Sequence, residues 1–329
     1  NIKCFVQISA PGAVAGDPNP FLATKALADE RLRRSCLSWT ILRPGLVIGR
    51  NAYGGTMLIR ALAALPGIQI CVHGQRRVQC VALTDVAAAV IACLETVDRA
   101  DRDVDLVERG GSSLAGLIGT HRRWLGLSAP RWSIDLAPWI TAPVVFLADF
   151  LGHLGWRSPL RSTALAMVAR DVVGAADAGE QLLGRPLLNL DEMLRREPAG
   201  MQDRIQARLY LMIPTIVGAL SLLFVLSGGA SLGQMHRVVA ELEGTPAAGE
   251  AALLLGMTGG VADILLGLAI LVRSWARRAA LGMAALASAY VVTGSWLRPD
   301  MWLDPLAPLA KALAVMMLAL VAWLALEER

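Results

Sequence analysis

The sequence predicts an α/β domain with a parallel sheet, followed by an all-α bundle of four membrane-spanning helices. Two observations lead to this prediction. Val6 to Gly49 runs as apolar strand, loop, helix and second apolar strand, which is the repeating unit of a parallel sheet covered by helices. After Arg204, four apolar stretches follow, each close to the roughly 20 residues that a spanning helix needs. The 329 residues are 55% hydrophobic, more than is usual for a soluble domain, and suffice for about two domains.

The strand, helix and strand of the first block place polar residues where parallel sheets bind ligands. The first strand ends at Ser9, the helix from about Pro20 carries Phe21 and Lys25 on one face, and the second strand leads into Arg43-Pro44-Gly45. Ligands bind at the carboxyl ends of such strands. We expect the second strand to end at Leu42, because proline cannot continue a central ladder.

This block resembles the second half of a short-chain dehydrogenase/reductase domain of the extended, NAD-dependent epimerase-like kind, so we expect the C-terminal half of a Rossmann-like fold. In that superfamily a Ser or Thr, a Tyr-x-x-x-Lys and an Arg-Pro-Gly-type turn surround the nicotinamide of NAD or NADP. Ser9, Lys25 and Arg43-Pro44-Gly45 match those places. The resemblance implies that all of them bind cofactor and that Ser9 and Lys25 are catalytic.

Phe21 occupies the position of the superfamily's tyrosine, whose hydroxyl gives its proton to the carbonyl that receives hydride. Phenylalanine has no proton to give, although Lys25 can still hold the ribose. One alternative is therefore a domain that binds or senses cofactor without turnover. The other is a different proton donor: Tyr53, the only tyrosine outside the membrane block, or else water or the substrate. Arg43 is either structural, bonding loop carbonyls, or substrate-binding.

The superfamily's glycine-rich phosphate loop is absent from this chain, which begins at Asn1 inside the predicted strand. We expect an N-terminally truncated fragment. The five cysteines form no C-x-x-C pair and are predicted to be reduced core thiols, and no residue spacing predicts a metal site. Asp85 resembles the acidic residue of the superfamily's V-x-x-x-D-V-A segment, with a helix N-cap as the alternative.

We expect three parts: residues 1–104 as the cofactor half-domain, 105–203 as a helical substrate or lid region, and 204–329 as the membrane domain. Leu136 to Phe150 is too short and too interrupted by proline to span a bilayer, and is predicted either to lie on the membrane surface or to be core. The predicted spans are about 209–227, 251–272, 279–297 and 306–326.

Basic residues predict the orientation of the spans. Arginines precede the first span and fill the second loop, whereas the first and third loops are mostly acidic. The positive-inside rule therefore places the N-terminal domain and the C-terminus in the cytoplasm, with the spans in the inner (cytoplasmic) membrane.

The membrane block resembles the DoxX-like membrane domain found behind an NAD(P)-binding reductase domain. The matching residues are the Leu209-Tyr210 opening with Pro214, Asp263 and Gly267 in the second span, and the run from Trp296 to Lys311. An ionisable residue inside a bilayer marks a functional site by default. We expect either that Asp263 pairs with Lys311, or that Lys311 reaches the outer surface while Asp263 is protonated or bonded to Ser or Thr.

These features predict a membrane-anchored NAD(P)-binding protein, a possible oxidoreductase acting on an apolar or membrane-associated substrate such as a quinone or lipid. The alternative is a non-catalytic NAD(P) sensor or assembly partner of a membrane oxidoreductase. A small-molecule carrier that uses Asp263 is a third possibility. The formal charge of only +4 and the placement of arginines beside apolar segments make nucleic acid an unlikely partner.

Overall fold

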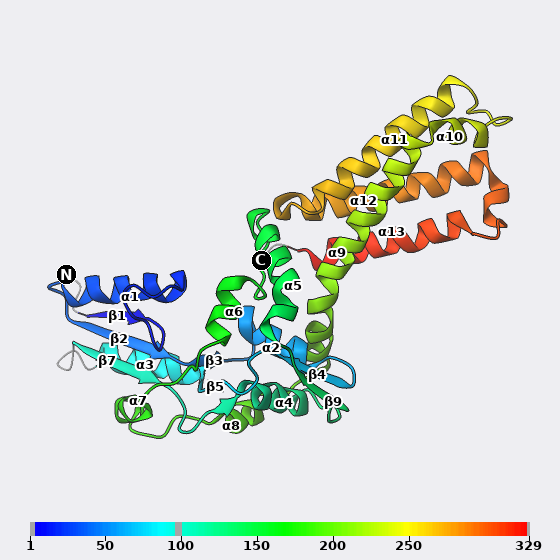
Figure 1. Cartoon of the computed structure of the whole chain (residues 1–329). Coiled ribbons are helices and arrows are strands. Elements are labelled where there is room, and N and C mark those ends of the chain that lie inside the picture. Colours follow the sequence, from blue (N-terminus) through cyan, green and yellow to red (C-terminus); the bar gives the residue numbers. More distant parts are fainter. Residues whose placement is uncertain (1–3, 96–100, 328–329) are drawn as a thin grey trace. The chain divides into compact units, whose positions relative to one another are not determined.

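The structure is a computed structural model that describes residues 4–95 and 101–327, in two compact units. The first unit, called here the α/β unit, holds the residues up to Asp149 together with Ser158–Tyr210, and the second, called the bundle, holds Phe150–Arg157 and the residues from Leu211 on. The elements of Figure 1 are, in chain order, β1 Phe5–Ile8, α1 Pro20–Arg33, β2 Trp39–Pro44, β3 Leu46–Ile48, α2 Gly54–Ala63, β4 Ile68–Cys71, β5 Arg77–Val78, β6 Cys80–Ala82, α3 Leu83–Glu95, β7 Arg102–Leu106, β8 Ser112–Ser113, α4 Leu114–Trp124, β9 Trp132–Asp135, α5 Pro138–His153, α6 Ser162–Val168, α7 Ala176–Leu183, α8 Leu190–Arg196, α9 Met201–Gly233, α10 Met235–Glu241, α11 Glu250–Ala269, α12 Arg273–Leu297, η2 Pro299–Trp302 and α13 Pro308–Ala325.

The α/β unit is built on parallel strands, which confirms the predicted fold class. Strand β2 lies between β1 and β7 and is parallel to both. Beyond this sheet the chain continues in smaller pairings, parallel between β3 and β6 and between β4 and β9, and antiparallel between β5 and β8. Apolar side chains of β2, β6, α3 and β7 pack into a shared core, with Leu42, Val81, Ala89 and Leu106 fully buried.

The prediction that the second strand ends at Leu42 is wrong, because β2 continues to Pro44. Pro44 pairs with Leu106 of β7, while the ladder between β2 and β1 ends at Leu42 opposite Ile8. Successive residues of a strand direct their backbone polar groups to opposite neighbouring strands. The carbonyl of Leu42 accepts from Ser9 on the β1 side, and the N–H of Gly45 donates to Leu106 of β7. The nitrogen of Pro44 therefore faces the β1 side, where the ladder with β1 has already ended. The missing N–H therefore breaks no ladder bond.

Helix α5 contains most of the stretch for which surface and core were the two alternatives, and little of it is buried. Only Ala148 of this helix is buried. Its large apolar side chains are exposed, with Trp139 at 77% and Phe146 at 76%. The alternative that α5 lies on a membrane surface stays a prediction.

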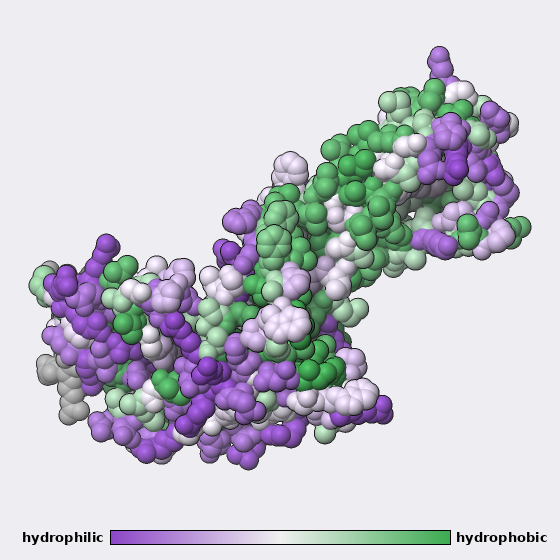
Figure 2. Space-filling view, viewed as in Figure 1, coloured by the Kyte–Doolittle hydropathy of each residue, from purple (hydrophilic) through white to green (hydrophobic). Residues whose placement is uncertain are grey.

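Among the described residues, four helices are long and apolar enough to cross a membrane, as predicted. They are α9, α11, α12 and α13, and Figure 2 shows hydrophobic side chains over much of their surface. Helix α9 begins eight residues before the predicted first span, and α10 fills part of a loop for which no helix was predicted. Small residues let the helices approach closely: a Cβ on Gly228 of α9 would overlap the carbonyl oxygen of Gly260 in α11.

Candidate functional site

The buried carboxylate of Asp29 organises the residues that the sequence assigns to the cofactor. It accepts hydrogen bonds from Ser9 Oγ and Gln7 Nε2, both at 2.7 Å. The guanidinium of Arg43 lies 3.8 Å from the same carboxylate and 3.1 Å from that of Asp103. Ser9 is itself buried, so its hydroxyl proton is committed to Asp29 and does not point at a substrate.

Sequence reasoning missed Asp29, although a signal for it was present. The buried residues of α1 are Leu22, Ala26, Asp29 and Leu32, which follow the spacing of one helix face. An aspartate on an otherwise apolar face needs partners, since burying an unpaired charge is costly. The pattern therefore pointed to a hydrogen-bonded carboxylate on the buried face of α1.

Lys25 lies at the carboxyl end of β1, and its role in binding cofactor stays a prediction. Its ammonium donates a 2.8 Å hydrogen bond to the carbonyl oxygen of Ile8. An ammonium has three donors, so two remain for a ligand at this edge. These residues fit a ribose, which needs donors, but they supply no acid, because Phe21 is an unprotonatable ring with 48% of its surface exposed.

Tyr53 is not brought to this group in the structure. It stands at the N-cap of α2, 63% exposed, and its backbone N–H bonds Thr56. Within the described residues, no contact joins its hydroxyl to Ser9 or Lys25.

Gly45 has a structural reason to be glycine. A Cβ there would overlap the carbonyl oxygen of Gln79 and lie 3.1 Å from Val107 Cγ1. The backbone N–H of Gly45 donates to Leu106 O at 3.0 Å, and Leu46 N–H donates to Gln79 O at 2.9 Å. Gly45 thus lets the chain pass from β2 into β3 against the neighbouring strands, whether or not it also touches a cofactor.

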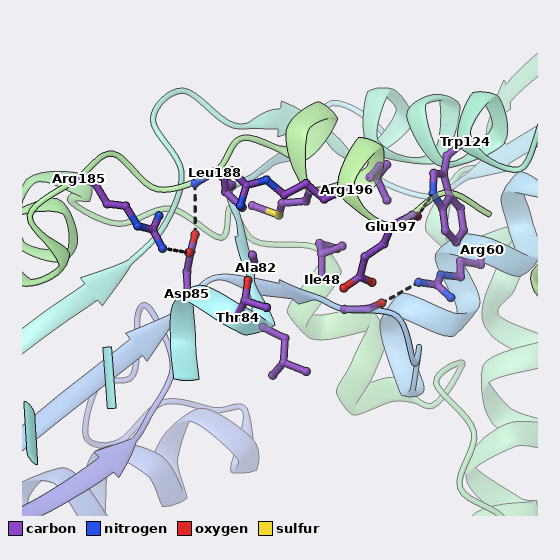
Figure 3. A pocket seen from close by; sticks show the side chains of 14 residues that line it. Ile48, Arg60, Ala82, Thr84, Asp85, Trp124, Arg185, Leu188, Arg196 and Glu197 are labelled. Atoms are coloured by element: carbon purple, nitrogen blue, oxygen red, sulfur yellow. Dashed lines mark hydrogen bonds and ion pairs between the residues drawn. The ribbon is translucent and has the colours of Figure 1, made fainter. Parts of the chain in front are cut away.

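A cavity of about 270 Å³ lies elsewhere in the α/β unit, at the ends of β3 and β6 (Figure 3). Asp85 accepts hydrogen bonds from Arg185 at 2.6 Å and from the backbone N–H of Leu188 at 3.2 Å. Asp85 is the third residue of α3, so the N-cap alternative is wrong and its carboxylate instead holds the segment around Arg185. The resemblance to the superfamily's acidic residue is the alternative that remains.

Arg60 and Trp124 form the opposite wall of this cavity. The guanidinium of Arg60 lies 4.6 Å from the centre of the Trp124 ring and donates to the carbonyl oxygens of Gly49 and Arg50. Burial lowers the pKa of Arg60, and the carboxylate of Asp203 at 3.6 Å opposes that shift. The wall is basic, and the Nε of Arg60 is buried without a hydrogen-bond partner among the described residues.

The bundle has its own polar site around Asp263 of α11, which is only 3% exposed. Ser227 of α9 and Tyr290 of α12 donate hydrogen bonds to its two carboxylate oxygens, at 2.9 and 3.1 Å. Lys311 of α13 lines the same cavity, of about 210 Å³, but the structure records no ion pair between Lys311 and Asp263. The direct pair is therefore not formed, and the bond to a serine is the alternative that the geometry supports.

The other sequence predictions concern metals and thiols. Among the described residues, no group of three or more His, Cys, Asp or Glu side chains could hold a metal ion. All five cysteines are free thiols, and Cys71, Cys80 and Cys93 are buried as predicted, whereas Cys36 is exposed and is not a core residue. Burial raises the pKa of Cys71 to about 11, so that thiol is inert rather than nucleophilic.

Residues 221–320 match the model of the DoxX-like family. Over 193 residues the chain is 33% identical to a mitochondrial protein of Arabidopsis thaliana named NADH dehydrogenase [ubiquinone] 1 alpha subcomplex subunit 9. That match covers 52% of this chain and 47% of the plant protein, so the chain spans about half the length of its relative.

Two solved structures are similar to the α/β part. One is a nucleoside-diphosphate-sugar epimerase from Staphylococcus aureus, with 15% identity, a TM-score of 0.44, and coverage of 59% of this chain and 64% of that chain. The other is an NADPH-dependent quinone oxidoreductase from Escherichia coli in complex with NADPH, with 20% identity, a TM-score of 0.45, and coverage of 59% and 65%. The chain spans just under two thirds of each.

Proposed function

We propose that this protein binds NAD or NADP on a membrane-anchored α/β unit and serves a redox reaction of a lipid-soluble acceptor, a quinone. The observation that carries the proposal is the position of Lys25, whose ammonium sits at the carboxyl end of β1 with two donors to spare. Four spanning helices in the same chain hold this unit at the bilayer, where apolar acceptors are concentrated. The plant relative's name, which contains both NADH and ubiquinone, supports the same pairing.

The proposal includes the predicted location. The spans lie in the inner (cytoplasmic) membrane, with the α/β unit and the C-terminus on the cytoplasmic side. The arginines at Arg273, Arg277 and Arg278, between the second and third spans, support that orientation.

A second candidate is a non-catalytic nicotinamide sensor or assembly partner of a membrane oxidoreductase. Three features favour it: Phe21 cannot donate a proton, the Ser9 hydroxyl is committed to Asp29, and Tyr53 lies apart from both. Quinone reduction by NADH or NADPH distinguishes the candidates, because an oxidoreductase catalyses it and a sensor does not. Solvent water can supply the protons that a quinone takes up, whereas a carbonyl acceptor needs a positioned acid.

Cofactor binding is tested by replacing Lys25 with methionine in the intact protein, purified in detergent. We expect the Kd for NADH or NADPH to rise about 10- to 100-fold, since a hydrogen bond from a charged donor contributes roughly 1.5–3 kcal/mol. Fluorescence of the bound dinucleotide measures it. Arg31→Met removes an exposed positive charge from the same helix and should leave the Kd within about twofold. Equal affinities for both variants would contradict the role of Lys25.

The proton donor is tested by Phe21→Tyr and Tyr53→Phe. We expect Phe21→Tyr to raise NAD(P)H oxidation by carbonyl substrates about 100-fold or more, the usual contribution of a general acid, and to change quinone reduction little. Tyr53→Phe should leave both rates unchanged. A large loss on Tyr53→Phe would make Tyr53 the donor, and cofactor binding without turnover on either substrate class would leave the sensor as the function.

A further inference from the structure

The cavity in the bundle is built by all four spanning helices. Its polar side chains are Ser227 of α9, Asp263 of α11, Tyr290 of α12 and Lys311 of α13. Its volume of about 210 Å³ equals that of about seven water molecules at roughly 30 Å³ each, enough for one substituted six-membered ring. The walls are apolar apart from the side chains of four residues.

Those four side chains leave a defined set of hydrogen-bonding groups for a ligand. Ser227 and Tyr290 direct their protons to Asp263. An ionised carboxylate only accepts hydrogen bonds and has about four lone-pair sites, so Asp263 can accept at least one more. Lys311 has three ammonium donors, for which no partner is recorded among the described residues. The cavity thus presents an acceptor at Asp263 and a donor at Lys311.

The charges of these groups select a neutral ligand. One carboxylate and one ammonium cancel, so a charged ligand would leave a net charge among the apolar walls of the cavity, which is costly. The occupant must therefore be uncharged, apolar in its body, and able to donate a hydrogen bond at one end and accept one at the other. A para-quinol satisfies all of these conditions, whereas a quinone turns a carbonyl oxygen toward the Asp263 carboxylate, where both groups are acceptors.

We propose that this cavity binds the head group of a lipid-soluble quinol, with one hydroxyl donating to Asp263 and the opposite oxygen accepting from Lys311. The inference rests on the proposed function in naming the quinone as the acceptor, and adds that the reduced form is held inside the bundle. Tyr290 and Ser227 then act as positioning residues that fix the carboxylate for the quinol.

The experiment measures binding of decylubiquinol and of decylubiquinone, without dinucleotide, to the intact protein in nanodiscs under anaerobic conditions. We expect the wild-type protein to bind the quinol about tenfold more tightly than the quinone. Asp263→Asn should remove or invert that preference, because an amide can also donate to a carbonyl. Lys311→Met should weaken both forms about tenfold. Tyr290→Phe should reduce the preference, and Tyr210→Phe, the same change at a tyrosine outside the cavity, should not.

Two results would overturn the proposal: equal affinity for quinol and quinone in the wild-type protein, or affinities unmoved by both Lys311→Met and Asp263→Asn. Tyr290→Phe keeps the ring volume and provides the test if Asp263→Asn fails to fold. Dinucleotide binding measured on the same preparations separates the two proposals. If the protein binds dinucleotide and reduces quinone but the variants leave quinol and quinone affinity unchanged, the cavity proposal alone is wrong. If the protein binds quinol selectively but binds no dinucleotide, the proposed function alone is wrong.

Discussion

Replacing Arg122 with methionine is expected to destabilise the α/β unit by about 3–5 kcal/mol, the largest single effect we expect in this protein. The buried guanidinium donates hydrogen bonds to three backbone carbonyls: Ala63 and Leu65 at 3.0 and 2.7 Å, and Ser128 at 2.6 Å. Ala63 ends α2, so Arg122 binds the carbonyls that a helix terminus leaves unpaired. Methionine fills part of the space but removes the donor of all three carbonyls, and Ala63 is a buried residue.

Pulse proteolysis of the α/β unit across a urea series measures this loss in the intact protein. Arg123→Met is the matched control, because the guanidinium of Arg123 is exposed and, among the described residues, bonds only the hydroxyl of Thr120. The control should shift stability by less than about 0.5 kcal/mol. Indistinguishable urea midpoints for the two variants would show that the three carbonyls find other partners.

Acidification is expected to destabilise the same unit through His121. Burial lowers the pKa of His121 to about 4, and the positive charge of Arg60 adds to that shift, whereas the unfolded chain protonates near the ordinary value of 6.5. Below pH 6.5 the unfolded state binds more protons than the folded state, so the free energy of unfolding decreases as the pH is lowered. The loss is about 2 kcal/mol at pH 5 and about 3 kcal/mol at pH 4, and none is expected above pH 7.

The variant His121→Asn isolates this contribution, since its amide can still donate to the Leu117 carbonyl that accepts from His121 Nδ1 at 2.9 Å. Urea midpoints by pulse proteolysis are compared at pH 7.5 and pH 5. The wild-type protein should lose about 2 kcal/mol more than the variant between these two values. Equal pH dependence in both proteins would mean that His121 is protonated, or solvated, in the folded state.

The spans and the parallel strands could be predicted from sequence because each depends on a local property. A run of about 20 apolar residues has few stable alternatives to a spanning helix, and short apolar runs between loops form buried strands. The ends of elements were harder to predict. Residues 201–208 are rich in polar and charged side chains, and they extend α9 because Ala207 packs into the core of the α/β unit, which no local pattern records.

The partners of the site residues could not be predicted, because they come from distant segments. Ser227 and Tyr290 reach Asp263 across 36 and 27 residues of sequence, and Asp29 reaches Ser9 across 20. The position of Lys25 could be predicted because it depends only on a strand end and the helix that follows. Pro44 was misplaced because the rule against proline in a ladder depends on which neighbour its nitrogen faces.

The chain crosses between the two units three times, after Asp149, after Arg157 and after Tyr210. The short middle segment belongs to the bundle: Trp156 donates a 2.6 Å hydrogen bond to Leu271 O, and Arg273 N–H donates to Leu154 O at 2.9 Å. Truncation after Tyr210 would therefore not release an intact fragment. It would remove Leu271 and Arg273, the partners of residues 150–157, and it would end the chain in the middle of α9. Expression of the α/β unit by itself needs a replacement linker between Asp149 and Ser158.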